Sequence, residues 1–339
     1  MTRLGFGGIP IQQLPEADAV AVVRKCYNAG IRLFDTAYGY TNSEERIGKA
    51  LAGVRDEVFV ITKSPARDRE TLRTHFETSL RRTGFERFDV FLFHNVVSHD
   101  HLSAILGGAD LMGWMRRQQE AGRVGLIGIS SHRAETAVDC LKTGEFAAVE
   151  FPFNYLEDQA LPELLPLARE TGTAFLAMKP MAGGALSSGR AAIKWLMAQP
   201  DVLAIPGMMT LQQVDEAVAA ATGEPGLTPD EEAAIARDRR ELSGTFCRRC
   251  GYCLPCPQGI EINTVVSSEL FLNRAGWQRA NEAYLKMLEH AIDNCQQCGE
   301  CEARCPYYLP LSELVKATAV RVAEKVRARL GRQQADMGR

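Results

Sequence analysis

Short apolar runs alternate with amphipathic stretches through the first two thirds of the chain. The runs are rich in β-branched and aromatic residues, which favours strands, at residues 4–9, 33–36, 58–63, 90–94, 124–130, 148–153, 174–179 and 203–207. The stretches between them repeat apolar residues every three or four positions, which predicts helices, at residues 16–29, 43–52, 68–82, 110–121, 134–141, 161–170, 190–198 and 211–221. Such an alternation over roughly 220 residues predicts an α/β protein with a (β/α)8 TIM barrel, which usually takes about 250 residues.

An open, doubly wound sheet is the competing fold for this alternation. That fold would place a G-x-G-x-x-G turn directly after the first strand, where the backbone meets a dinucleotide phosphate. Here Gly5, Gly7 and Gly8 lie inside the first predicted strand, and Ile9 and Pro10 follow them. The sequence therefore favours the closed barrel.

Beyond the predicted barrel, residues 1–228, the pattern contains helices without strands. Residues 229–243 are rich in Glu and Arg and predict a connecting helix. Residues 263–293 carry apolar and aromatic side chains at helical spacing, so we expect residues 244–312 to form a small α-helical domain. Residues 313–339 hold an excess of Arg and Lys and predict a basic helical tail, solvated by default or a contact for an acidic redox partner.

Composition narrows the class of protein. With 339 residues and 46% hydrophobic content, the chain can bury the cores of one large and one small domain. The net charge of −3 argues against a nucleic-acid-binding protein. No apolar run is long enough to span a membrane, and no export signal is evident. We therefore expect a cytoplasmic protein.

Eight of the ten cysteines fall in two short runs near the C-terminus. The second run has the spacing C-x2-C-x2-C-x3-C-P of a bacterial [4Fe–4S] ferredoxin, and the first has one residue fewer before its last cysteine. We therefore predict that these cysteines bind [4Fe–4S] clusters. The first run holds Cys247, Cys250, Cys253 and Cys256, followed by Pro257, and the second holds Cys295, Cys298, Cys301 and Cys305, followed by Pro306.

Other uses of these cysteines fit less well. A disulfide framework belongs to short secreted domains. Structural zinc uses two C-x2-C pairs on a longer spacer and needs no following proline. In two-cluster ferredoxins the fourth cysteine of a run binds the other cluster, so we expect Cys256 to join the second run and Cys305 to join the first. The alternative is a single cluster on the second run alone.

Barrel enzymes carry their chemistry where strands end at the carboxyl side. Asp35 and Tyr40 follow the second predicted strand, Lys63 ends the third and His94 ends the fourth. Tyr40 can protonate the alkoxide that forms when a hydride reaches a carbonyl, and a nearby Lys63 would lower its pKa from about 10. Asp35 can hold Lys63, and His94 can donate a hydrogen bond to the carbonyl oxygen. This set suits reduction of a carbonyl or oxidation of an alcohol.

With these residues the sequence resembles an aldo-keto reductase, over roughly residues 4–222. The matching motifs are residues 4–10, 34–40 with 43–45, Thr62 with Lys63, His94, 128–130 and 205–207. The resemblance implies a nicotinamide-dependent oxidoreductase with Asp35, Tyr40, Lys63 and His94 as its catalytic tetrad. With the cysteine runs included, the chain resembles the subgroup that carries a C-terminal 4Fe–4S ferredoxin-type domain.

The resemblance also implies which residues hold the nicotinamide. Ser130 matches the first residue of a Ser-Asn pair, Ser131 replaces the Asn, and Glu150 stands where the family has a Gln. Met178 replaces the aromatic residue that stacks on the ring, although it also suits packing at the barrel end. Lys179 follows it and could face the cofactor pyrophosphate or an acidic substrate.

The clamp for the 2′-phosphate of NADP departs most from the family. Gly207 and Met208 stand where a Lys-Ser pair would be, and Gln213 occupies the place of an Arg. Two cations are thereby missing from the site that would bind the 2′-phosphate. The cofactor can therefore be either NADP or NAD.

Two functions follow as hypotheses. The first is an NAD(P)H-linked oxidoreductase acting on a small-molecule carbonyl or alcohol, whose clusters are structural or pass electrons to a redox partner protein. The second is an iron–sulfur electron-transfer or redox-sensing protein whose barrel binds nucleotide with little turnover. The presence of all four tetrad residues favours the enzyme.

Overall fold

The fold is described from a computed structural model, which describes residues 3–108, 110–242, 246–275 and 277–337. The described chain divides into two compact units. The first takes in the residues up to 181 together with residues 188–235, and the second takes in residues 182–187 and the residues from 236 onward. The expected boundary at residues 243 and 244, and the last two residues of the expected tail, lie outside the described residues.

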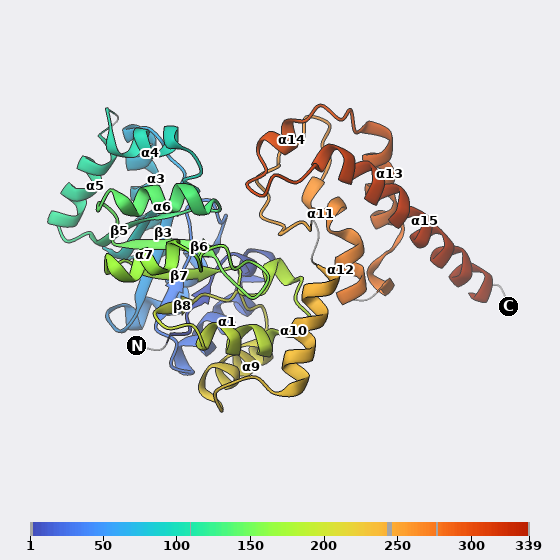
Figure 1. The fold of residues 1–339 in the computed structure, drawn as a ribbon, viewed down its shortest axis with the longest axis horizontal. Coiled ribbons are helices and arrows are strands. Elements are labelled where there is room, and N and C mark those ends of the chain that lie inside the picture. The colour runs from blue at the N-terminus through green and yellow to red at the C-terminus, as the bar shows by residue number, and fades with distance from the viewer. Residues whose placement is uncertain (1–2, 109, 243–245, 276, 338–339) are drawn as a thin grey trace. The chain divides into compact units, whose positions relative to one another are not determined.

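The first unit is a barrel of parallel strands in sequential order (Figure 1). It closes because Leu4 pairs with Ala204 and the Gly5 amide donates to the Ala204 carbonyl at 2.7 Å. The expected (β/α)8 barrel is therefore confirmed. Its strands are β1 (Phe6–Gly7), β2 (Leu33–Asp35), β3 (Phe59–Ser64), β4 (Phe88–Phe93), β5 (Val124–Ser130), β6 (Ala148–Pro152), β7 (Ala174–Met178) and β8 (Val202–Ala204).

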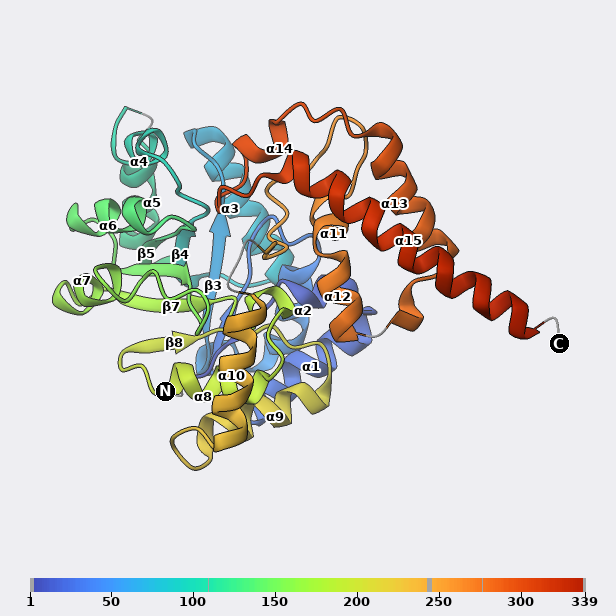
Figure 2. The same ribbon diagram turned by 45° about the vertical axis from the view of Figure 1, so that its right-hand side comes forward.

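Helices lie outside these strands (Figure 2). The sequence did not predict α4, which begins after Ser98, whose hydroxyl accepts from the His101 amide. The helices of this unit are α1 (Glu16–Asn28), α2 (Ser43–Leu51), α3 (Arg69–Thr83), α4 (His99–Leu106), α5 (Leu111–Glu120), α6 (Ala134–Lys142), α7 (Leu164–Glu170), α8 (Gly189–Met197) and α9 (Leu211–Thr222), while α10 (Pro229–Glu241) runs across the division between the units.

Two apolar layers hold the barrel together. An inner cluster fills its interior with residues such as Leu33, Ile61, Leu176 and Met178. A larger cluster lies between the strands and the helices. Gly7 is required where β1 meets β8, since a Cβ there would lie 2.7 Å from the Ile205 carbonyl oxygen. Burial of these two layers fixes the strand ends that carry the site.

The second unit is helical. Its helices are α11 (Ile262–Val266), α12 (Ser268–Ala275), α13 (Glu282–Asn294), α14 (Glu300–Ala303) and α15 (Leu311–Met337). α13 packs along α15 (Figure 1), and Val315, Ala319, Val322 and Val326 of α15 are buried in this unit's core. The expected tail is therefore more than a solvated helix, because its apolar side completes the core. None of the described helices is both long and apolar enough to cross a membrane.

Candidate functional site

Three neighbouring strands bring the predicted tetrad to one rim of the barrel. Asp35 ends β2, Lys63 lies in β3, and His94 directly follows β4. The Lys63 ammonium donates to Asp35 Oδ1 at 2.5 Å and to the Thr36 carbonyl at 2.9 Å. Its Nζ lies 5.1 Å from the centre of the Tyr40 ring, and the Tyr40 and His94 rings meet edge to face with centres 5.9 Å apart. The four side chains thus lie together.

Electrostatics assign a charge to each member. Lys63 is fully buried, yet the carboxyl groups of Asp35 and Glu150 raise its pKa above the ordinary value, so it stays charged. Burial and the cations Lys63 and Arg67 lower the pKa of His94 to about 3. His94 is therefore neutral at physiological pH and suited to donating a hydrogen bond rather than a full charge.

The expected acidity of Tyr40 needs a correction. Lys63 does lower the pKa of Tyr40, but burial of the phenol is the larger cause and raises it above its usual value. The expectation that Lys63 brings this pKa below about 10 is therefore wrong for this site. Tyr40 is protonated at neutral pH, which is the form that can give a proton to an alkoxide.

A second carboxyl group reaches the same lysine from across the barrel. Glu150 lies in β6 opposite Ser130 of β5. Its Oε2 is 3.2 Å from Lys63 Nζ, close enough for an ion pair but not aligned as a hydrogen bond. Only 2% of Glu150 is exposed. The amino-acid sequence alone did not predict this contact, because β3 and β6 are not adjacent strands of the barrel.

Non-glycine residues in the left-handed region follow three of the predicted site residues. Thr41 has a φ of 35°, Asn95 of 56° and Lys179 of 54°. They come directly after Tyr40, His94 and Met178. The Lys179 turn is supported by Asn154, whose Nδ2 donates to the Lys179 carbonyl at 3.0 Å. Such conformations cost energy and concentrate at functional sites.

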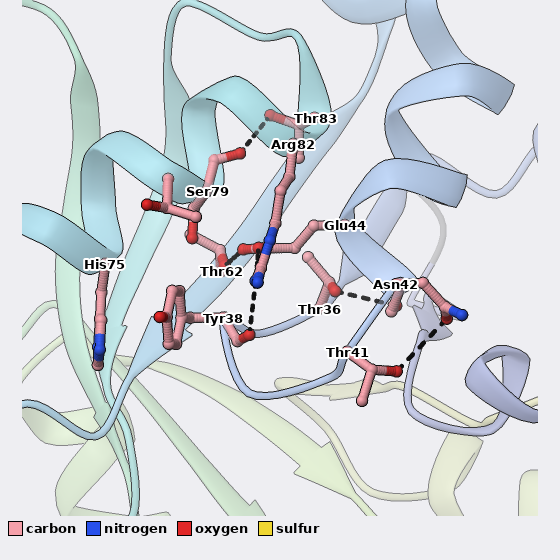
Figure 3. A network of polar contacts seen from close by, with 12 residues as sticks. Thr36, Tyr38, Thr41, Asn42, Glu44, Thr62, His75, Ser79, Arg82 and Thr83 are labelled. Atoms are coloured by element: carbon pink, nitrogen blue, oxygen red, sulfur yellow. Dashed lines mark hydrogen bonds and ion pairs between the residues drawn. The ribbon is translucent and has the colours of Figure 1, made fainter.

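A partly buried clamp between α2 and α3 holds the segment that carries Tyr40 (Figure 3). Arg82 donates to the Tyr38 carbonyl at 2.9 Å and contacts Glu44 Oε2 at 3.3 Å. The Thr62 hydroxyl donates to Glu44 Oε1 at 2.7 Å. The Tyr38 ring also stacks on His75, with centres 3.6 Å apart. The sequence motif contained Glu44, but nothing in the chain's pattern linked it to Arg82.

Helices α2 and α3 approach closely enough for this clamp because of one glycine. A Cβ on Gly48 would lie 2.1 Å from the Thr83 carbonyl oxygen. Glu44 lies one turn before Gly48 in α2, and Arg82 directly precedes Thr83 in α3. The small residue at position 48 therefore lets the buried Glu44 carboxylate meet the guanidinium of Arg82.

The residues expected to hold the nicotinamide differ in their hydrogen bonds and in their burial. The Ser130 hydroxyl accepts from the Asn95 amide at 2.9 Å. Ser131 is fully buried, and its hydroxyl donates to the Val96 carbonyl at 2.6 Å and accepts from the Arg133 amide. Met178 belongs to the inner barrel cluster and is 9% exposed, as barrel-end packing predicts.

The expected 2′-phosphate region contains no cation at the three positions in question. Gly207 is exposed, whereas Met208 is buried in the core. The Gln213 side chain accepts from the Met209 amide at 2.7 Å and so closes the loop after β8. The role of these residues in nucleotide binding stays a prediction.

The two cysteine runs line two separate cavities in the second unit. One cavity, of about 90 Å³, is lined by Cys256, Cys295, Cys298 and Cys301. The other, of about 10 Å³, is lined by Cys247, Cys250, Cys253 and Cys305. Each run thus places three cysteines at one cavity and its last cysteine at the other. Arg304 links the runs by donating to the Pro255 carbonyl at 2.9 Å.

The buried thiols of these cavities suit a cluster of positively charged metal ions. Burial raises the pKa of Cys247 to about 11 and that of Cys253 to about 12. A bound metal deprotonates a thiol outright, because its positive charge offsets the cost of burying the thiolate. Among the described residues, no group of three or more His, Cys, Asp or Glu forms a site for a single metal ion. Four thiolates are the ligand set of a [4Fe–4S] cluster.

A phenol beside a charged lysine at the carboxyl end of a closed parallel barrel is the arrangement of a barrel-type oxidoreductase. Residues 3–191 match the model of the aldo/keto reductase family, and the chain belongs to that family. Residues 246–310 match the model of a 4Fe-4S dicluster domain. The resemblance inferred from the sequence is thereby confirmed.

Known proteins show the same family and fold. A probable aldo-keto reductase from Glycine max is 27% identical over 203 residues, which make up 54% of this chain and 57% of that protein. The aldo/keto reductase from Klebsiella pneumoniae in complex with NADP and acetate aligns with a TM-score of 0.58 and 21% identity, over 69% of this chain and 90% of that one. The holo form of an aldo-keto reductase from Bacillus halodurans aligns with a TM-score of 0.60 and 21% identity, over 70% and 91%.

Proposed function

We propose that this protein is an NAD(P)H-linked oxidoreductase that reduces a small-molecule carbonyl to an alcohol, or runs the reverse reaction. The convergence of Tyr40, Lys63 and His94 at the barrel rim carries the proposal. A bound nicotinamide would supply or accept the hydride. Tyr40 gives its proton to the carbonyl oxygen, and neutral His94 donates a hydrogen bond that orients the same oxygen. Lys63, held by Asp35, stabilises the phenolate that remains.

The nucleotide is proposed to be NADP or NAD. The Klebsiella pneumoniae relative binds NADP, and Glu150 offers a buried oxygen without a hydrogen bond where the family holds the carboxamide. Ser130, Lys179 and Met178 surround the same rim and would border the ring. Met208 and Gln213 bring no cation toward a 2′-phosphate, so we propose no strong preference for NADP.

Replacing Tyr40 with Phe tests this function. Loss of the proton donor should lower carbonyl reduction by about 10²–10⁴-fold while nucleotide affinity stays nearly unchanged. Tyr27→Phe is the matched control, because the Tyr27 hydroxyl contacts Glu57 on the surface and lies away from the rim. Full turnover in Tyr40→Phe would show that another group supplies the proton.

We further propose two [4Fe–4S] clusters, one in each cysteine-lined cavity. Replacing Cys305 or Cys256 with Ser should each remove one thiolate from one cavity and lower the iron content by about half or more. Cys140→Ser is the control, since Cys140 is buried in the barrel. If Cys247→Ser left the iron content unchanged, a single cluster on the second run would be the better model.

The role of the clusters is proposed as electron transfer to a redox partner protein or as support of the helical unit, and a reducing cytoplasm suits both. The competing function is an electron-transfer or redox-sensing protein in which the barrel binds nucleotide with little turnover. A hydride carries two electrons and a cluster accepts one, so coupling needs a converter such as a flavin.

Anaerobic addition of NADH or NADPH separates these cases. Bleaching of the clusters would favour electron exchange, and carbonyl-dependent oxidation without bleaching would favour a self-contained reductase.

A further inference from the structure

Lys63 is enclosed by two carboxyl groups rather than one. Asp35 approaches its ammonium from β2 at 2.5 Å, and Glu150 approaches it from β6 at 3.2 Å. The exposed fraction is 0% for the Lys63 side chain, 4% for Asp35 and 2% for Glu150. If both carboxyl groups were ionised, the buried trio would carry a net negative charge, which a low-dielectric interior strongly disfavours.

The two carboxyl groups lie close together because both contact the same ammonium, Asp35 Oδ1 at 2.5 Å and Glu150 Oε2 at 3.2 Å from Lys63 Nζ. Two carboxylates can only accept, so such a contact would be repulsive without a hydrogen between them. Glu150 Oε2 is buried and has no hydrogen bond from any donor of the described residues. One proton held between Asp35 and Glu150 removes the repulsion.

The groups that face this pair support one shared proton. Lys63 favours ionisation of both carboxyl groups, and Lys179, after β7, favours ionisation of Glu150. Burial has the opposite effect to these cations because it disfavours a charged carboxylate. Burial and the Glu150 carboxyl group together raise the pKa of Asp35 to about 8. Burial likewise raises the pKa of Glu150. Tyr40 is held protonated beside them. For such a pair, the proton belongs to both residues rather than to one.

We propose that Asp35 and Glu150 share one proton at neutral pH in the protein without nucleotide, and that the pair releases it when an oxidised nicotinamide binds. The second half rests on the proposed function. A positively charged ring next to the pair balances a second carboxylate, whereas a reduced ring carries no such charge. Binding that releases one proton strengthens by roughly tenfold per pH unit. Affinity for the oxidised nucleotide should therefore rise with pH, and affinity for the reduced nucleotide should not.

Infrared spectroscopy of the protein without nucleotide tests the shared proton directly. Wild type at neutral pH should show the carbonyl stretch of a protonated carboxyl group, and Glu150→Gln should lose it because Asp35 then pairs with Lys63 alone. If Glu150→Gln fails to fold, Asp35→Asn must remove the same band. Asp89→Asn is the control, since Asp89 pairs with Arg55 and accepts a hydrogen bond from the Val60 amide. A band that survives in Glu150→Gln or Asp35→Asn would overturn the proposal.

Calorimetry in buffers of different ionisation enthalpy tests the release. Binding of NAD⁺ or NADP⁺ to wild type should release close to one proton, and NADH or NADPH close to none. Glu150→Gln should release close to none with either form. Equal release by wild type and Glu150→Gln would overturn the coupling. A failure of every nucleotide to bind would count against the proposed function, while the infrared band would still decide whether the proton is shared.

Discussion

Arg82 lies outside the tetrad, yet its side chain should affect the rate of the reaction. Replacing it with Met keeps the aliphatic stem but removes the guanidinium that holds the Tyr38 carbonyl and Glu44. Within the described part of the chain, the Glu44 carboxylate, whose side chain is 0% exposed, would keep only the Thr62 hydroxyl as a hydrogen-bond partner. Leaving a buried charge unpaired typically costs about 3–5 kcal/mol. Arg82 itself is 28% exposed, so water compensates part of this and we expect about 2–3 kcal/mol.

The effect on catalysis should follow from the Tyr38 carbonyl, because Tyr40 lies two residues further along the same segment. A shift of about 1 Å in a catalytic group costs roughly 10²-fold in rate. We therefore expect Arg82→Met to lower kcat by roughly 10–100-fold with nucleotide affinity nearly unchanged. Turnover with a carbonyl substrate and nucleotide titration by fluorescence measure the two quantities separately.

A double-mutant cycle tests the cause. Glu44→Gln removes the charge that Arg82→Met leaves unpaired, so the double variant should be more stable than the sum of the two single losses predicts. Thermal unfolding followed at the barrel measures this. Strictly additive losses, or an Arg82→Met protein with wild-type kcat, would show that the clamp does not position Tyr40.

Two further variants probe the barrel. Gly48→Ala should destabilise it by about 1–3 kcal/mol, since its Cβ would lie 2.1 Å from the Thr83 carbonyl oxygen, whereas Gly53→Ala, with open space around it, should be nearly neutral in thermal unfolding. Because the pKa of His94 in the folded protein is about 3, the unfolded chain binds a proton at this residue below about pH 6.5 that the folded chain does not. Stability should therefore fall as the pH drops from about 6.5 toward 3, and His94→Gln should flatten that part of the curve; equal slopes in both proteins would contradict the assigned burial.

The sequence predicted the barrel because strand and helix periods are local properties that this chain expresses clearly. It missed α4, a short helix that Ser98 caps between the strand predicted at residues 90–94 and the helix predicted at residues 110–121. The prediction for residues 313–339 rested on their charge. Val315, Val322 and Val326 nevertheless form an apolar stripe at helical spacing, and this stripe is buried in the core of the second unit. That stripe was visible in the sequence and could have been used.

The site was predictable residue by residue but not pair by pair. Asp35 and Lys63 come from neighbouring strands, so their contact follows from the strand order. Glu150 reaches Lys63 across the closed barrel, and that contact depends on barrel closure and strand tilt rather than on any spacing along the chain. The raised pKa of Tyr40 likewise depends on the depth of burial, which a sequence motif does not encode.

The left-handed residues after Tyr40, His94 and Met178 imply a conflict between durability and activity. Thr41 and Lys179 adopt a backbone conformation that costs a non-glycine residue roughly 1–2 kcal/mol. Glycine would relieve that cost but would also free the rim to move. Selection for heat resistance alone should therefore favour glycine at positions 41 and 179, and the resulting proteins should gain thermal tolerance while losing turnover.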